Sequence, residues 1–202
     1  MITSREIERC PWAGADATYI RYHDEEWGVP MTDDRALFEK LMLEGFQAGL
    51  SWITILRKRE NFRNAFHNFD AERIARYSAR DIERLLKNEG IIRNRAKIEA
   101  TISNAKVYLE IRNRMRFSQY IWGFIDGRPI VNALASTKDI KPETDVSKRI
   151  SKALKADGFR FVGSTSVYAF MQSTGMVNDH LVSCFRHAAC AKLQKKLKIA
   201  EL

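Results

Sequence analysis

The chain has 202 residues, 45% of them hydrophobic and 10% aromatic, which is enough to bury a core and argues against intrinsic disorder. Its 34 lysine and arginine residues against 25 aspartate and glutamate residues give a formal net charge of +9, so we expect a polyanionic partner, nucleic acid first. No apolar run is long enough to span a bilayer and the first residues do not form a signal peptide, so we expect no membrane partner and a cytoplasmic location.

Helical periodicity dominates the first half of the chain. Residues 32–34 offer an N-cap, and the apolar residues that follow them recur on one helical face. Ser51 can cap a second helix in the same way. Ser78, followed three residues later by Asp81, has the pattern of a capping box and predicts a third helix, which we expect to end at Gly90.

The second half of the chain continues the helical pattern around one polar loop. Residues 95–112 repeat apolar side chains at helical spacing, and the polar stretch 136–146 predicts a connecting loop. Two further helices are expected at 145–156 and 163–174, each followed closely by a glycine. Only residues 159–162 alternate as a strand would, and the alternation is brief, so the predicted fold class is all-α.

The segment at about 81–105 has the shape of a helix-hairpin-helix element. An amphipathic helix leads to Gly90, a tight apolar hairpin includes Ile92, and a second helix starts at once. Backbone N–H groups and the helix dipole at the start of the second helix favour a DNA phosphate. Because the usual hairpin has a second glycine where this chain has Ile92, an ordinary αα-hairpin is the alternative. The basic residues that would add charge at this contact are Arg93, Arg95 and Lys97.

Four side chains suited to metal binding lie near the two ends of the chain. Cys10 and His23 are in the N-terminal part, and His180 and Cys184 are in the C-terminal part. The second pair has i, i+4 spacing, which we expect to place both side chains on one helical face. Two thiolates and two imidazoles complete the closed tetrahedral set that Zn²⁺ prefers. On chemistry alone, other candidate ligands are Cys190, His187 and His67.

The segment 12–52 is dense in large aromatic residues. Most of them would form core in any globular protein, but Trp and Tyr together also suit a pocket for an extruded base, whose faces they stack. Glu44 stands in an otherwise apolar helix end, where a carboxylate is exposed, paired or functional. The candidate pocket residues are Trp12, Tyr19, Tyr22, Trp27 and Trp52.

These residues fall in runs that resemble the Tag-type family of 3-methyladenine DNA glycosylases, within the helix-hairpin-helix superfamily. The runs follow the expected order through most of residues 8–185. They are ERCPW, YIRYHDEEWGVP, LFEKLMLEGFQAGLSWITILRKRENFRNAF, EGIIRNRAKIEA and GFRFVGSTSVYAFMQSTGMVNDHLVSC. The loop at 136–146 and the basic tail after Cys184 lie outside these runs, and we expect the tail to be solvated.

The resemblance implies an all-α fold of two lobes with a DNA groove between them, and residues 1–202 would form a single catalytic domain. It implies an enzyme of base-excision repair that flips N3-methyladenine out of alkylated double-stranded DNA and excises it by hydrolysing the N-glycosidic bond. It also implies one structural zinc ion per chain, which joins the segments 10–23 and 180–184. By resemblance the zinc ligands are Cys10, His23, His180 and Cys184, and Cys190 is not among them.

The resemblance also carries roles onto the pocket. The base-reading carboxylate falls on Glu44, and the stacking and hydrogen-bonding aromatics fall on Tyr22 and Trp52. No lysine is marked as a nucleophile, so a monofunctional enzyme without a lyase step is expected. Asp126 follows the hairpin, but its Asp-Gly sequence is typical of a turn and we interpret it as structural. The residues that line or support the pocket would be Tyr19, Trp12 and Trp27.

Two other functions fit the sequence. One is a zinc-stabilised module that binds damaged DNA without excising a base, and the other is a glycosylase for a different lesion. The aromatic cluster with Glu44 favours an enzyme, because backbone binding alone needs no deep cavity. Nothing in the sequence calls for an obligate protein partner, and we expect a monomer.

Overall fold

Helices form most of the structure, a computed structural model that describes residues 7–197. None of the helices in this range has the length and apolarity needed to cross a membrane. The elements in chain order are η1 (Pro11–Ala13), α1 (Ala17–Glu25), α2 (Asp34–Gln47), α3 (Trp52–Ala65), η2 (His67–Phe69), α4 (Ala71–Ile74), α5 (Ala79–Leu86), α6 (Arg95–Arg112), α7 (Phe117–Gly123), β1 (Ile130–Val131), η3 (Thr137–Asp139), α8 (Asp145–Ala156), α9 (Ser164–Ser173), β2 (Val177–Asn178) and α10 (Phe185–Lys195). The predicted all-α class is confirmed. The end of the basic tail, residues 198–202, lies outside the described residues.

The predicted capping residues begin their helices as expected. The Asp33 carboxylate accepts the backbone N–H of Ala36 at 2.8 Å at the start of α2. The helix predicted to start at residue 145 is α8, and there the Thr144 hydroxyl accepts a backbone N–H three residues further on. At the start of α5, the backbone N–H of Ser78 donates to the Asp81 carboxylate at 2.9 Å. These bonds satisfy polar groups that a helix end would otherwise leave without partners.

Two predicted helix boundaries differ in detail. Ser51 stands at the N-cap of α3, but its hydroxyl bonds the Thr54 hydroxyl at 2.8 Å and not a backbone N–H. Helix α5 ends at Leu86, four residues before the predicted Gly90. The Asn88 side chain accepts the N–H of Gly90 at 2.9 Å, so an Asx-type bond shapes this turn where a glycine cap was expected.

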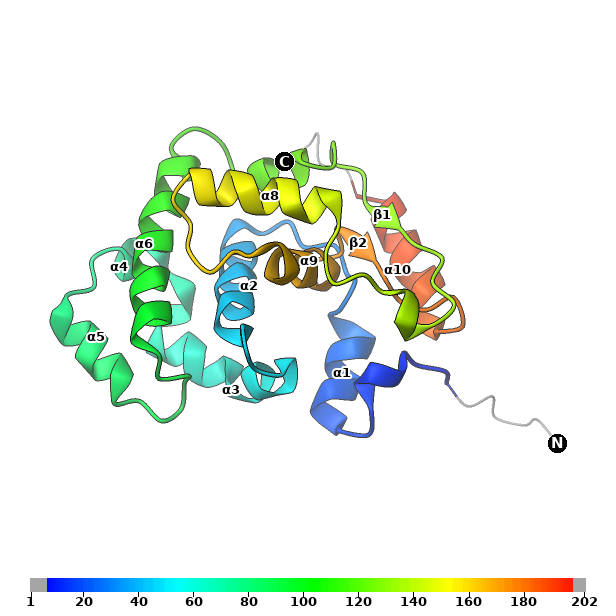
Figure 1. Ribbon diagram of the computed structural model, residues 1–202, viewed down its shortest axis with the longest axis horizontal. Helices are drawn as coiled ribbons and strands as arrows, with labels where there is room; N and C mark the ends of the chain where they lie inside the picture. The colour runs from blue at the N-terminus through cyan, green and yellow to red at the C-terminus, as the bar shows by residue number, and fades with distance from the viewer. Residues whose placement is uncertain (1–6, 198–202) are drawn as a thin grey trace.

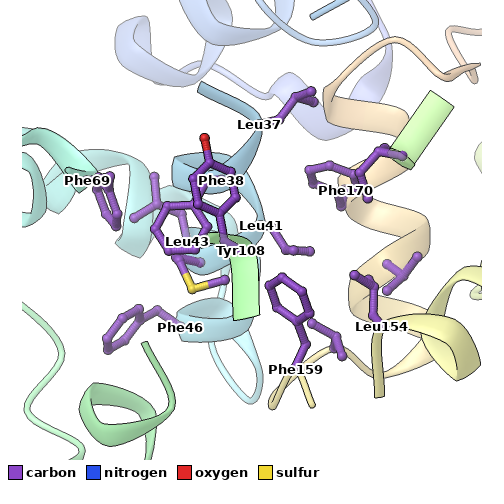
Figure 2. Close-up of a cluster of buried hydrophobic side chains, with 14 of the residues drawn as sticks. Leu37, Phe38, Leu41, Leu43, Phe46, Phe69, Tyr108, Leu154, Phe159 and Phe170 are labelled. Carbon is purple, nitrogen blue, oxygen red and sulfur yellow. The ribbon is translucent and has the colours of Figure 1, made fainter. Parts of the chain in front are cut away.

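Helix α2 lies at the centre of the molecule, with α9 on one side and α3 and α6 on the other (Figure 1). Figure 2 shows its apolar side chains between Phe69 on one side and Phe170 and Leu154 on the other. Each fully buried side chain of this size contributes about 1.5–3 kcal/mol of stability. A helix covered on all sides is normally apolar all round, yet α2 also buries Lys40 and Glu44, which are 4% and 3% exposed. The fold therefore buries two charged side chains at its centre.

A short parallel sheet, which the sequence did not predict, positions the C-terminal part of the chain. Ile130 pairs with Val177 in β1 and β2, and a further bridge joins Leu134 to Leu181. Strands of two residues carry no alternating pattern that could reveal them. This ladder fixes the segment that leads from α9 into His180, and so it helps to place the candidate metal ligands.

Candidate active site and metal centre

A pocket of about 190 Å³ opens between η1, α1, α2, α3 and α9. The structure thus brings together all six residues that the sequence marked for a base pocket, although they span positions 12 to 52. The lining residues are Trp12, Tyr19, Tyr22, Trp27, Glu44, Gln47, Trp52, Ile140, Ala169, Gln172 and Ser173.

The five aromatic rings form a preformed wall. The ring centroids of Trp12 lie 5.0 Å from those of Tyr19 and Trp27, and the Tyr22 and Trp52 centroids are 5.5 Å apart. These separations fall in the range where aromatic pairs attract one another. Three of the rings are buried while Trp12 and Tyr19 are half-buried, so the wall is anchored in the core and reaches the surface. Such a wall suits a flat, aromatic ligand.

Glu44 projects from the last turns of α2 into this pocket. One of its carboxylate oxygens accepts the Ser173 hydroxyl at 3.0 Å, while Oε2 has no partner in the described part of the chain. Burial raises the pKa of Glu44 to about 7, and Lys40 and the Ser173 hydroxyl hold it down. The buried indole N–H of Trp52 likewise has no partner among the described residues. A free acceptor and a free donor in one aromatic pocket suit the polar edge of a heterocyclic base.

The four predicted metal ligands converge on one point. The Sγ of Cys10 lies 3.5 Å from Nδ1 of His180, and the Sγ of Cys184 lies 3.5 Å from Nε2 of His23. All four ligand atoms lie within 4.8 Å of one another, and all four side chains are buried. A tetrahedral ion with bonds of about 2.0–2.3 Å would hold its ligands about 3.3–3.8 Å apart. These residues can therefore hold a metal ion.

Further hydrogen bonds orient the ligands. The Nδ1 atom of His23 lies 2.7 Å from the Asp24 carboxylate, and Nε2 of His180 lies 3.0 Å from the carbonyl oxygen of Trp27. Partners of this kind fix the tautomer and the plane of a metal-binding imidazole. Each cysteine sulfur of the set also accepts one backbone N–H. A hydrogen bond from the Cys10 thiol, together with hydrogen bonds from the imidazoles of His180 and His23, holds the pKa of the Cys184 thiol well below its usual value.

The local structure that places the second ligand pair differs from the predicted helix. His180 follows β2, and Cys184 is the N-cap of α10, so the pair spans a turn and does not share a helical face. The sheet and the Asn178 side chain, whose oxygen accepts the N–H of His180 at 3.3 Å, hold the turn. The prediction of a helical face was wrong, because the strand pairing delays the helix until after Cys184.

The other candidate ligands lie outside the cluster. Cys190 is buried on α10, six residues after Cys184, and accepts a hydrogen bond from Arg186 at 3.5 Å. His187 is engaged at 2.8 Å by the carbonyl oxygen of Asn132. His67 is an exposed residue in η2. Among the described residues, a four-ligand set forms from Cys10, His23, His180 and Cys184.

The predicted helix-hairpin-helix segment consists of α5, a turn at 87–94, and α6. Arg93 and Arg95 are exposed at the turn, with ion pairs to glutamates at 3.5 Å and 2.6 Å. Gly90 and Ile92 are half-buried within the turn. The geometry leaves the two arginines accessible to a polyanion.

Lys97 does not fit the predicted role at a DNA phosphate. It is 8% exposed, and its ammonium donates to the carbonyl oxygens of Phe46 and Ala48 at 2.8 Å and 2.7 Å. These carbonyls belong to the C-terminal end of α2, where helix carbonyls lack intrahelical partners. Burial lowers the pKa of Lys97. The residue is a structural cation at the C-terminal end of α2, and the direction of its side chain cannot be read from its own segment.

Several pocket residues were not predicted. Ala169, Gln172 and Ser173 share one face of α9, a spacing that could have been noticed had α9 been placed beside α2. Ile140 reaches the pocket from the polar stretch that was expected only to connect helices. Gly45 allows α2 to approach the Phe161 backbone, since a Cβ there would lie 3.3 Å from its carbonyl oxygen.

Asp126 lies where the sequence placed it, in a turn. Its φ is 51°, it is exposed, and it is not among the residues that line the pocket. A residue with positive φ in an Asp-Gly turn fits the structural interpretation.

The helical fold and the aromatic pocket agree with the class of protein that the sequence predicts, the DNA glycosylases, enzymes that hydrolyse N-glycosyl bonds. A family model described as methyladenine glycosylase matches residues 12–187. The chain belongs to the methyladenine glycosylase family.

Relatives in this family are close. The DNA-3-methyladenine glycosylase of Haemophilus influenzae is 53% identical over 177 residues, which cover 87% of this chain and 96% of that protein. A crystal structure of 3-methyladenine DNA glycosylase I has a TM-score of 0.88 at 54% identity and covers 89% of this chain and 100% of its own. A Staphylococcus aureus structure that describes 3-methyladenine recognition has a TM-score of 0.86 at 36% identity, with 90% and 97% covered.

Proposed function

We propose that this enzyme excises N3-methyladenine from alkylated double-stranded DNA by hydrolysis, without a lyase step. The observation that carries the proposal is the buried Glu44 carboxylate, which has a free oxygen in a pocket walled by five aromatic rings. The names of the Haemophilus influenzae and Staphylococcus aureus relatives, which refer to 3-methyladenine, support the same substrate.

The chemistry of the lesion suits these groups. N3-methyladenine is cationic while it is attached to the sugar and departs as a neutral base, so selection and positioning matter more than acid catalysis. Electron-rich rings attract a cation by about 0.5–2 kcal/mol each. In this proposal Tyr22 and Trp52 stack on the base, and Tyr19, Trp12 and Trp27 line or support the site.

Glu44 would discriminate between the lesion and normal adenine. Its free oxygen can accept a hydrogen bond from the exocyclic amine, and its negative charge opposes the charge of the methylated base. Normal adenine is neutral and gains less from this contact. Alkylation also weakens pairing and stacking, so extrusion of the lesion costs less.

Water is the proposed nucleophile. A lyase step would require an amine that attacks the sugar, and the pocket lining formed by residues 7–197 includes no lysine. The residues of a single chain suffice to form the pocket and the candidate metal site, so the proposed enzyme acts as a monomer.

We propose that the metal is zinc and that its role is structural. Two thiolates and two imidazoles, each imidazole with a second hydrogen bond, form the closed set that zinc prefers. When bound, the ion would link Cys10 and His23 to His180 and Cys184, and a closed set leaves no position at which to activate water. This zinc site, which we call the clasp, would hold the segments 10–23 and 180–184 together beside the pocket.

The proposed DNA contact is the turn between α5 and α6. Arg93 and Arg95 are exposed there, and backbone groups near Gly90 and Ile92 lie beside the N-terminus of α6, which favours an anion. These contacts would position the duplex without reading its sequence.

The test is release of free bases from methylated double-stranded DNA, resolved by chromatography. The proposal expects N3-methyladenine above the spontaneous rate. Binding without release would favour a damage-recognition module, and release of a different base would favour a different lesion. A borohydride-trapped enzyme–DNA adduct would contradict the absence of a lyase step.

A further inference from the structure

Lys40 lies in the core directly behind the aromatic wall. It is 4% exposed, stands one helical turn before Glu44 on α2, and does not line the pocket. Its ammonium lies 4.9 Å from the Tyr22 ring centroid and 4.8 Å from the Trp52 ring centroid. It donates one hydrogen bond, of 3.4 Å, to the Tyr22 hydroxyl. No carboxylate within residues 7–197 forms an ion pair with it at 4 Å or less.

The other charges around Lys40 are already paired. Glu26, at the end of α1, accepts two bonds from Arg59 of α3, one of them at 2.8 Å. Glu39 of α2 is paired with Arg63 of α3 at 2.7 Å. Lys40 and Glu44 are therefore two buried charges of α2 that balance each other, Lys40 against the rings of the wall and Glu44 in the lining of the pocket.

Within residues 7–197, the groups that face Glu44 include no cation other than Lys40. They are Lys40 on its own helix, the Ser173 hydroxyl of α9, and the phenols of Tyr19 and Tyr22 on α1. Both phenols carry raised pKa values because of burial, with a further contribution from Glu44, so they stay neutral. A buried carboxyl without an opposing charge takes up a proton.

We propose that Lys40 is a positioning residue for the glycosylase reaction, whose buried ammonium keeps Glu44 ionised and braces Tyr22 and Trp52 before the cationic base arrives. The inference rests on the proposed function and assigns the ammonium no contact with the base. Burial raises the pKa of Glu44 to about 7 and lowers that of Lys40 to about 8, while each charge favours the other. Near pH 7 Lys40 is thus mostly charged, and Glu44 is at the midpoint of its titration.

The position of Lys40 also affects selectivity. A cation held against the rings of Tyr22 and Trp52 weakens their attraction for a second cation, because like charges repel through a medium of low dielectric. Stacking alone therefore discriminates less well between the charged lesion and neutral adenine. The discrimination falls on Glu44, and Lys40 keeps Glu44 in the charged form that provides it.

The test is the pH profile of kcat/KM for release of N3-methyladenine from methylated DNA by Lys40→Met, since kcat/KM reports groups of the free enzyme. Loss of the ammonium should raise the acid midpoint by about one pH unit or more. From a wild-type midpoint near 7, that shift lowers kcat/KM about five-fold at pH 7. Near pH 9 the kcat/KM values of the wild type and Lys40→Met should become equal, because Lys40 of the wild type has then lost its proton.

The matched control is Lys106→Met, which removes one positive charge from an exposed position on α6 and should leave the midpoint unchanged. Lys40→Arg keeps the charge and should restore the wild-type midpoint. Methionine is flexible and of similar length, so it can fill the space that the Lys40 side chain occupies. If Lys40→Met folds poorly, Lys40→Gln removes the same charge and carries the same expectation.

A direct readout is the titration of the Glu44 side-chain carboxyl carbon by NMR, with Glu44→Gln to assign the signal. Its midpoint should rise in Lys40→Met. If Lys40 had only a structural role, Lys40→Met would lower kcat/KM by the same factor at every pH and would leave the Glu44 midpoint unchanged. That result would overturn the inference. If the wild type itself releases no N3-methyladenine, the proposed function fails; if it does so and the variant keeps the wild-type midpoint, only the role of Lys40 fails.

Discussion

Replacement of Glu44 by glutamine changes one charge in the pocket and almost none of its shape. The Ser173 hydroxyl can still donate to the amide oxygen, so the position of the side chain is expected to be kept. What the variant loses is the negative charge beside the free acceptor position. The substitution therefore isolates the electrostatic part of base recognition.

The expected loss of activity follows from the strength of hydrogen bonds to charged groups. Such bonds contribute about 1.5–3 kcal/mol, and each 1.36 kcal/mol is a factor of ten in rate. The kcat/KM for N3-methyladenine should thus fall about ten- to hundred-fold in Glu44→Gln. The wild-type rate should also fall as the pH drops through about 7, where Glu44 takes up its proton, whereas the rate of the variant should not.

The free energy of unfolding should change in the opposite direction to kcat/KM, so that Glu44→Gln gains stability while it loses activity. The folded state raises the pKa of Glu44 from 4.5 to about 7, so it holds this proton to higher pH than the unfolded chain does. The cost of ionising Glu44 in the folded state therefore grows between about pH 4.5 and pH 7 and reaches on the order of 3 kcal/mol. Glutamine avoids this cost, although Lys40 without its counter-charge offsets part of the gain. We expect the variant to be more stable than the wild type at about pH 8 but not near pH 5.

Two measurements check this reasoning. Release of free bases from methylated DNA gives kcat/KM for both proteins across the pH range, and urea denaturation at two pH values gives their free energies of unfolding. Excision by Glu44→Gln at the wild-type rate would refute the role of the charge. If the variant were less stable than the wild type at pH 8, burial of the ionised Glu44 carboxylate would not carry the free-energy cost that we infer.

Three further substitutions test other parts of the structure. Cys184→Ser should lower the zinc content, measured by atomic absorption, and the melting temperature by about 5–15 °C, with less effect on excision by the folded fraction; a stable, zinc-free protein would contradict the clasp. Lys97→Met should cost about 2 kcal/mol in urea denaturation, because two carbonyls of α2 lose their donor, while the salt dependence of DNA binding stays the same. Gly175→Ala should cost more than about 1 kcal/mol, because φ is 71° and its Cβ would lie 2.5 Å from the Val29 backbone; an unchanged melting temperature would show that the chain relaxes there.

Local sequence signals predicted the helices well, because each helix carries its own information. Asp33 and Ser78 stand at the N-caps where the sequence predicted them, and the apolar period of α2 and α6 matches their burial. The two-residue strands were missed because their pairing depends on residues far apart in the chain. The turn that carries His180 was misplaced for the same reason, since its pairing with Leu134 is not local.

Residue types predicted the content of the site better than its geometry. The density of aromatics around Glu44 indicated a pocket, and the resemblance assigned the metal ligands; the structure brings both sets together. The direction of a charged side chain on a helix is not encoded in its own segment. Lys97 was expected at the surface and is buried, and Lys40 drew no interpretation although it lies behind the pocket.

The meeting of the two chain ends has a consequence for biosynthesis. Cys10 and His180 are 170 positions apart, and a ribosome that adds about 5–20 residues per second needs roughly ten to thirty seconds to pass from one to the other. The face of α9 that completes the pocket also emerges late, just before His180. During that interval the nascent chain holds half a metal site and an aromatic wall without its opposite side. A chain interrupted before α9 would therefore lack one side of the pocket as well as half of the metal site.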